Sequence, residues 1–329
     1  MLVPHYWAEA RLQHREGRRT VTVRRFGWSD ESEALAQAHA EARAREALDR
    51  VLAGETLPRR ERRVAYNGAE GMPIREEIVE RHGEAVVTRN GYGALCLNTP
   101  DLLFADIDFA LRPSSGRAIL LSMAVTAVCV AVGLHVGLGR GWPVALVAAF
   151  FASLVIGIPI PGLLQRWSVA ARGGAERLAL QRVHRFLSSR PDWRIRLYRT
   201  PAGLRLMAVH RPFDPREPAV PQAFDALGAD PVYARMCFNQ HCFRARLTPK
   251  PWRIGMSRLR PPSSAAWTPE HALLPARQAW IEDYQRRSTR YAACRYLETL
   301  GGGAEDPALT ALREFHDLVC AADRELPLA

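Results

Sequence analysis

The sequence predicts an α+β cytosolic domain with an inserted transmembrane helical hairpin and a C-terminal helical segment. Three observations support this expectation: two long stretches lack any formal charge, strand-like and helix-like segments alternate on both sides of them, and helical spacing dominates the end of the chain. Hydrophobic residues make up 48% and charged residues 24%, which excludes a largely disordered chain. The net charge of +11 favours anionic partners.

Residues 1–55 are predicted to form a ββα accessory module. Segments 5–12 and 20–28 alternate in part between apolar and polar residues, and a turn-like REGRR segment separates them. Helical spacing follows, up to Gly54, which is a natural end for a helix. Such a module either binds nucleic acid or packs as a lid.

The α+β core is expected in two parts, residues 56–116 and 167–262. The expected elements are a short helix at 74–82, strands at 85–88 and 102–109, a basic amphipathic helix at 170–188, and a strand pair at 193–200 and 204–210. Strands from both parts are expected to share one sheet. Residues 263–329 are predicted to form C-terminal helices, one at 276–300 and one after an Asp306-Pro307 cap.

Residues 117–166 are predicted to cross a membrane twice. The stretches 118–139 and 141–165 carry no formal charge, and a helix needs about 20 apolar residues to span the hydrocarbon core. Arginines flank the outer ends, whereas the turn holds only Arg140, so the positive-inside rule places both termini in the cytoplasm. The predicted location is a bacterial inner membrane; the alternatives are a buried helical hairpin and a re-entrant loop.

Asp106 and Asp108 form a D-x-D pattern at the end of a predicted strand. Residues two apart on a strand share one face, so the two carboxylates would lie together. Paired carboxylates of this kind bind Mg²⁺ or Mn²⁺ and so position a phosphate. The pattern therefore predicts a metal site. The alternative is a strand end whose aspartates face water or pair with arginines.

Residues 231–269 contain no acidic side chain but several basic and aromatic ones. Arg244 and Arg246 are two apart, Arg253 follows, and Lys250, the only lysine of the chain, lies between two prolines. Basic groups interleaved with aromatic rings are typical of phosphate and nucleic-acid binding. The alternatives are a patch that contacts anionic lipid and an ordinary solvated face.

The six cysteines do not indicate a disulfide framework in a chain of this length. Cys237, His241 and Cys242 are potential soft-metal ligands within six residues, but the pattern lacks a fourth ligand and the usual CxxC spacing. Buried structural thiols are the interpretation that this spacing favours.

Two resemblances follow from motifs. TRNGYGALCLNTPDLLFADIDF, LYRTPAGLRLMAVHRPFD and CFRARLTPKPWRI resemble segments of a bacterial two-span membrane protein family that has no assigned activity. The D-x-D strand and a later T-x-x-G-x-R unit resemble archaeo-eukaryotic primase-type nucleotidyltransferase domains. This second resemblance implies that Asp106 and Asp108 bind metal and that Asp230 or Asp214 supplies a third acid. The catalytic histidine of those domains would fall at Arg205, which could instead hold a phosphate, or be supplied by His210.

The sequence thus predicts an integral inner-membrane protein with a basic cytosolic α+β domain that binds nucleotide or nucleic-acid phosphates together with a divalent metal. The alternative is a non-catalytic, membrane-tethered binding or scaffold protein whose basic stretch contacts nucleic acid or anionic lipid. If the protein is an enzyme, metal-dependent phosphoryl or nucleotidyl transfer is expected, with sugar transfer less supported. The catalytic candidates are Asp106, Asp108 and His210. The phosphate-binding candidates are Arg205, Arg244, Arg246, Lys250 and Arg253.

Overall fold

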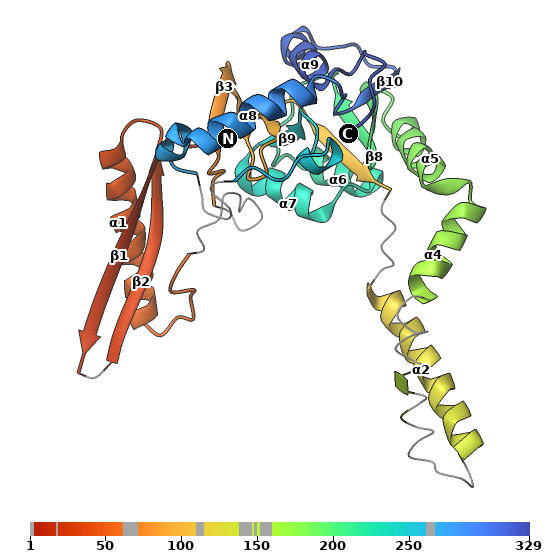
Figure 1. Ribbon diagram of the computed structural model, residues 1–329, viewed down its shortest axis with the longest axis horizontal. Coiled ribbons are helices and arrows are strands. Elements are labelled where there is room, and N and C mark those ends of the chain that lie inside the picture. The colour runs from red at the N-terminus through yellow and green to blue at the C-terminus, as the bar shows by residue number, and fades with distance from the viewer. Residues whose placement is uncertain are drawn as a thin grey trace.

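Two four-stranded antiparallel sheets lie at the centre of the computed structural model, and a separate two-stranded hairpin lies to one side (Figure 1). The structure describes residues 3–17, 19–61, 72–109, 115–137, 147, 150–151, 160–260 and 267–329. The strands are β1 (Tyr6–Glu16), β2 (Arg19–Ser29), β3 (Glu77–His82), β4 (Ala85–Arg89), β5 (Leu95–Thr99), β6 (Phe104–Asp108), β7 (Ile195–Thr200), β8 (Gly203–Ala208), β9 (Phe243–Arg246) and β10 (Arg295–Leu300). The α-helices are α1 (Glu33–Leu52), α2 (Ser115–Gly137), α4 (Ile160–Ala171), α5 (Gly174–Ser188), α6 (Ala219–Leu227), α7 (Pro231–Gln240), α8 (Pro275–Ser288) and α9 (Pro307–Cys320). Two short 3₁₀ helices are η2 (Pro251–Arg253) and η3 (Pro269–Leu273).

The accessory module consists of β1, β2 and α1, in the part of the chain where the sequence predicts it. Ser32 begins the helix, because its hydroxyl accepts a hydrogen bond of 3.2 Å from the backbone N–H of Leu35. Ala36, Ala40 and Ala44 are fully buried. These small side chains form the face of α1 that packs on the hairpin, so the helix approaches the strands closely.

The sheet with the order β10-β7-β8-β6 unites segments from both halves of the chain. β6 pairs with β8 across the whole central region of the sequence, which confirms that strands on both sides of that region share one sheet. A single apolar cluster joins Leu197 and Leu206 of this sheet to Leu97 of the sheet β3-β4-β5-β9, Val183 of α5 and Phe224 of α6. The two sheets and their helices therefore share one core.

Of the segments predicted as helix, one contains a strand instead and another is helical only in its first part. The helix expected at 74–82 is β3, which pairs with β4 through a turn in which Gly83 has a φ of 58°. The helix expected at 276–300 ends at Ser288, and the rest of that segment contains β10, which pairs with β7. The C-terminal segment is therefore not purely helical. In both cases a strand partner outweighs the local helical spacing, which carries no information about that partner.

The predicted transmembrane hairpin is wrong. Within the described ranges, no helix is both long enough and apolar enough to cross a membrane. This finding also contradicts the two spans, the inner-membrane location and the integral membrane protein predicted from the sequence. A charge-free stretch measures composition, whereas a span requires one unbroken helix. The described helix that overlaps the end of the second stretch, α4, has 12 residues, about 18 Å, and contains Arg166 just beyond that stretch. The turn predicted at 139–141 lies outside the described residues.

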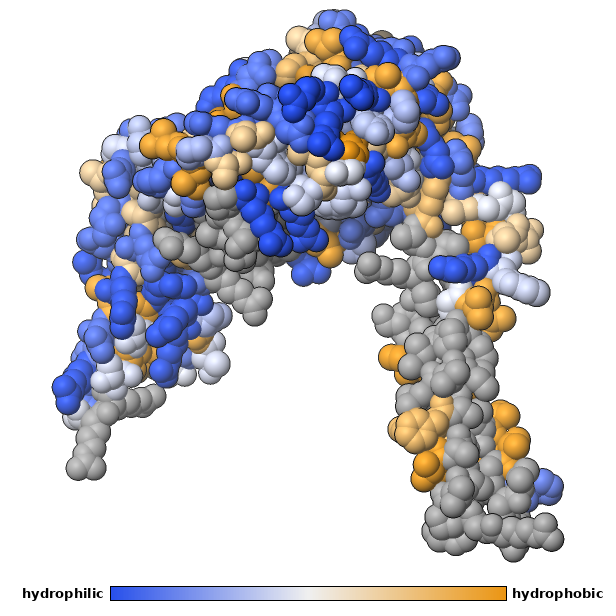
Figure 2. Space-filling view, viewed as in Figure 1, coloured by the Kyte–Doolittle hydropathy of each residue, from blue (hydrophilic) through white to orange (hydrophobic). Residues whose placement is uncertain are grey.

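The segment that contains α2 and α4 projects from the core on the side opposite the accessory module (Figure 1). Apolar side chains are visible on its surface (Figure 2), and Leu120, Met123 and Trp167 are each more than half exposed. None of the described residues of α2 or α4 lines the cleft that contains Asp106 and Asp108.

Candidate functional site

The D-x-D aspartates lie at the end of β6, beside β8. Asp106 is paired in register with Arg205, and Asp108 with Gly203. Ile107 between them is 2% exposed and belongs to the core, so alternation along the strand turns both aspartates to the opposite side. Gly203 is required here, because a Cβ at this position would collide with the carbonyl group of Ile107.

Arg205 holds Asp106 in a two-pronged ion pair. Its Nε lies 2.9 Å from Oδ1 of Asp106 and its Nη2 lies 3.2 Å from Oδ2. The Nη1 group donates to the carbonyl oxygen of Arg246 at 2.9 Å. Arg205 is 2% exposed, so the guanidinium is a fixed part of the wall behind Asp106.

Arg246, Lys250 and Arg253 form a basic wall of the cavity that also contains these aspartates. β9 carries Arg246, and the loop that follows places Lys250 directly before η2, where the N–H of Arg253 donates to the Lys250 carbonyl oxygen at 2.9 Å. Lys250 Nζ lies 5.6 Å from the centre of the Trp252 ring. The prolines on both sides of Lys250 restrict this loop, so the ammonium group is presented from a stiff backbone.

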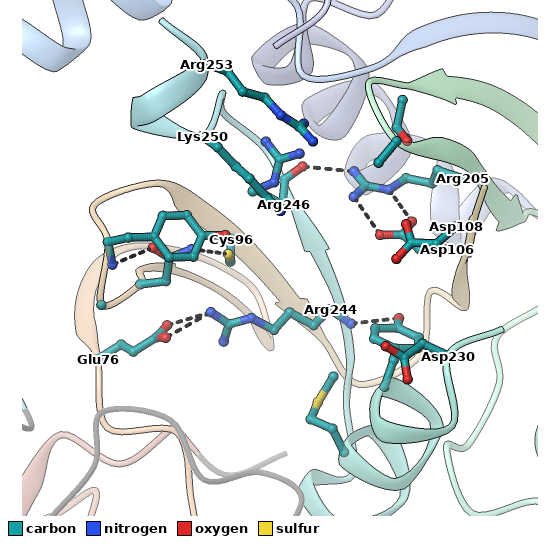
Figure 3. Close-up of a pocket in the computed structure, with 17 residues that line it drawn as sticks. Glu76, Cys96, Asp106, Asp108, Arg205, Asp230, Arg244, Arg246, Lys250 and Arg253 are labelled. Carbon is teal, nitrogen blue, oxygen red and sulfur yellow. Dashed lines mark hydrogen bonds and ion pairs between the residues drawn. The ribbon is translucent and has the colours of Figure 1, made fainter. Parts of the chain in front are cut away.

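These residues line one open cleft with a volume of about 610 Å³. Its charged residues are Glu76, Asp106, Asp108, Arg205, Asp230, Arg244, Arg246, Lys250 and Arg253. Figure 3 shows Asp106 and Asp108 next to Arg205, with Arg246, Lys250 and Arg253 on another side of the cavity. The structure thus brings the two D-x-D aspartates together with all five arginine and lysine residues that the sequence nominated.

Arg244 lines the cleft, but its guanidinium already forms an ion pair inside the protein. Its guanidinium contacts both carboxylate oxygens of Glu76, at 3.0 and 2.7 Å, and donates to Asn98 Oδ1 at 2.9 Å. The side chain of Glu76 is 2% exposed and that of Arg244 is 11% exposed. This buried ion pair makes Arg244 a structural residue rather than an available phosphate ligand.

Like charges lie close together on each side of the cleft. Burial raises the pKa of Asp108, and the neighbouring Asp106 carboxylate raises it further. Burial lowers the pKa of Lys250, and Arg246 and Arg253 add to this effect. Burial is the largest cause of each shift, and the opposite charges across the cleft do not fully offset it. A cation bound beside Asp108 and an anion bound beside Lys250 would stabilise the charged forms of both side chains.

His210 lies outside the cleft. Its ring packs at a tilt against Trp193 and edge-on against Phe213, with centroid distances of 4.8 and 5.2 Å, and burial lowers its pKa. Of the three catalytic candidates, only the two aspartates therefore line the cavity. Asp230, which the primase resemblance offered as a third acid, also lines it, whereas Asp214 does not.

Cys237, His241 and Cys242, the potential soft-metal ligands for which the sequence favoured buried structural thiols, do not converge. Both cysteines are buried, and His241 ends α7 in the left-handed conformation with a φ of 49°. In the described ranges they form no ligand group with another histidine, cysteine or carboxylate.

A different set does converge: Cys294, His316 and Cys320. The helical i, i+4 spacing of His316 and Cys320 was a usable signal in the sequence. The sequence held no comparable signal for Cys294, because its position beside these two residues depends on how β10 packs against α9.

No family model, curated protein or solved structure matches this chain. The resemblance to primase-type domains therefore stays a prediction. The D-x-D strand β6 does lie beside the strand β8 that carries Gly203 and Arg205. On that resemblance, Arg205 would stand where those domains have a histidine, and a guanidinium stays charged and cannot transfer protons.

Proposed function

We propose that the cleft binds a small phosphate-bearing molecule together with Mg²⁺ or Mn²⁺. The observation that carries this proposal is the separation of unpaired charge across one cavity. Within the described part of the chain, Arg246, Lys250 and Arg253 form no ion pair with a carboxylate, yet all three line the same cavity as Asp106 and Asp108.

The charges that remain after internal pairing fit a metal-phosphate ligand. Arg205 pairs with Asp106, and Arg244 pairs with Glu76. This leaves Asp108 and Asp230 on one side and the three cations of the basic wall, Arg246, Lys250 and Arg253, on the other. A divalent cation on the aspartate side and phosphate oxygens on the basic side would neutralise both sets.

The chemistry of the donors matches the proposed metal. Mg²⁺ and Mn²⁺ prefer carboxylate and water oxygens, and Asp106 and Asp108 offer such oxygens into an open cavity. Both oxygens of Asp106 already accept from Arg205, but each keeps a further lone pair. When bound, the cation would neutralise and orient a phosphate.

The size of the cavity favours a small ligand. About 610 Å³ lies within the range of roughly 300–1,000 Å³ that is usual for small-molecule sites. Tyr92 also lines the cleft, and it offers a ring for a flat group attached to the phosphate. A free polyphosphate or phosphate ester is therefore favoured over a duplex nucleic acid.

Isothermal titration calorimetry of the full-length chain tests this proposal. The probes are Mn²⁺ alone, pyrophosphate alone, pyrophosphate with Mn²⁺, a nucleoside triphosphate with Mn²⁺, and a single-stranded oligonucleotide. We expect pyrophosphate to bind more tightly with Mn²⁺ than without it, because the metal and the phosphate neutralise each other's sites. Tighter binding of the nucleoside triphosphate than of pyrophosphate would show that the flat group is a nucleobase. Tighter binding of the oligonucleotide than of either would contradict a small ligand.

Matched variants locate the binding site. Asp108→Asn should weaken the Mn²⁺ effect, and Lys250→Ala should weaken pyrophosphate binding with or without metal. Asp225→Asn on α6 and Arg45→Ala on α1 are controls, because both residues are exposed and lie outside the cleft. Absence of binding by every probe, or binding that both cleft variants leave unchanged, refutes the proposal.

A further inference from the structure

Three soft-metal ligands meet in the interior of the protein, and the proposed phosphate site uses none of them. Cys294 directly precedes β10, whereas His316 and Cys320 lie one turn apart on α9. Their ligand atoms all lie within 4.8 Å of one another. All three residues are 0% exposed, so their arrangement is set by the packing of α9 on the sheet rather than by solvent.

His316 is already oriented as a metal-binding histidine would be. Its Nδ1 lies 2.9 Å from Oδ1 of Asp317, whose other oxygen lies 2.7 Å from Nη2 of Arg196. An ionised carboxylate only accepts hydrogen bonds, so Nδ1 carries the proton and Nε2 keeps a free lone pair. Arg205 Nη1, a donor 3.3 Å from Nε2, agrees with this tautomer. Metal-ligating histidines nearly always make such a contact from their other ring nitrogen.

The charged residues around the three ligands already balance one another, so a dication there would not meet an uncompensated arginine. Arg205 is balanced by Asp106, and Arg196 is balanced by Asp317. The two cysteines would bind metal as thiolates, each releasing its thiol proton when the ion binds. A divalent ion would make the group of two thiolates and one neutral imidazole electrically neutral.

We infer that Cys294, His316 and Cys320 bind one Zn²⁺ ion, with a water molecule as the fourth ligand, and that this ion joins α9 to the residue directly before β10. Thiolate and imidazole ligands suit zinc, whereas Mg²⁺ and Mn²⁺ prefer oxygen, so this site is chemically distinct from the cleft. Binding would take the Nε2 lone pair away from Arg205. That guanidinium would keep its contacts with Asp106 and the Arg246 carbonyl oxygen.

Cobalt substitution in the full-length, reduced protein tests this inference. After adventitious ions are removed with a chelator, Co²⁺ is added, and Zn²⁺ is then titrated in. We expect one Co²⁺ per chain, thiolate-to-cobalt charge-transfer absorption in the near ultraviolet, tetrahedral d–d bands in the visible, and loss of both when zinc displaces cobalt. Wild-type protein that shows no thiolate–cobalt absorption overturns the inference, whatever the variants do.

Variants assign the ligands. The double substitution Cys294→Ser with Cys320→Ser should abolish the charge-transfer bands. The matched control is Cys237→Ser with Cys242→Ser, which removes two equally buried thiols and should leave the bands intact. Asp317→Asn should lower the affinity for Zn²⁺ about 10- to 100-fold, because it removes the carboxylate that orients His316. Charge-transfer bands that persist in the first double variant, or disappear in the control, refute the assignment.

Discussion

The ion pair between Glu76 and Arg244 predicts a large loss of stability when one partner is neutralised. Its two side chains are 2% and 11% exposed, and Glu76 also accepts a hydrogen bond from Thr88 Oγ1 at 2.6 Å. Glu76→Gln keeps the shape but leaves the Arg244 cation buried without a counter-charge. Breaking a buried pair from one side typically costs about 3–5 kcal/mol.

We expect the lower end of that range, about 3 kcal/mol, because the glutamine oxygen still accepts one hydrogen bond from Arg244. This corresponds to a change of about two orders of magnitude in the folding equilibrium. The assay is chemical denaturation of both proteins, with tryptophan fluorescence as the signal and the free energy of unfolding as the result.

A double substitution tests whether the cost of Glu76→Gln comes from the unpaired charge of Arg244. Replacing both residues, Glu76→Met with Arg244→Met, removes both charges from the interior and should cost less than Glu76→Gln alone. A loss below about 1 kcal/mol for Glu76→Gln, as measured for exposed pairs, would refute the reasoning that Arg244 is a structural residue.

Three further predictions concern the strands, the cleft and the accessory module. Gly203→Ala should speed amide hydrogen exchange in β6, because the new Cβ collides with the Ile107 carbonyl group; unchanged protection would contradict this close approach. The affinity for Mn²⁺ should fall on acidification, because a protonated Asp108 carboxyl binds metal poorly. Since the pKa of Asp108 is raised, this loss should begin at a pH above the ordinary aspartate pKa of about 3.9. Calorimetry at several pH values checks this, and Asp108→Asn should not show the loss. Ala40→Leu should destabilise the protein by about 1–3 kcal/mol in denaturation experiments, because Ala40 is fully buried between α1 and its hairpin; no loss would show that the interface has space.

Part of the cleft could be predicted from the sequence. Alternation in β6 places Asp106 and Asp108 on one face, and the prolines around Lys250 indicate a stiff basic loop; both are local patterns. The mutual position of these segments is not local, and neither is the partner of each charge. Arg205 and Asp106 are 99 residues apart, and Arg244 and Glu76 are 168 residues apart. The sequence therefore identified basic residues but did not separate the paired Arg205 and Arg244 from the unpaired ones.

Local physical preferences are what the sequence alone determined: the α+β composition, the first hairpin and its helix, the D-x-D face and the cap of the last helix. Each of these depends on composition or on residues that lie close together in the sequence. The tertiary structure decided the rest, including β3 and β10 as strands, the outward place of α2 and the meeting of Cys294 with α9. The physical reason is that strand pairing, counter-ions and metal ligands require partners brought together only by packing, which periodicity and charge content along the chain do not specify.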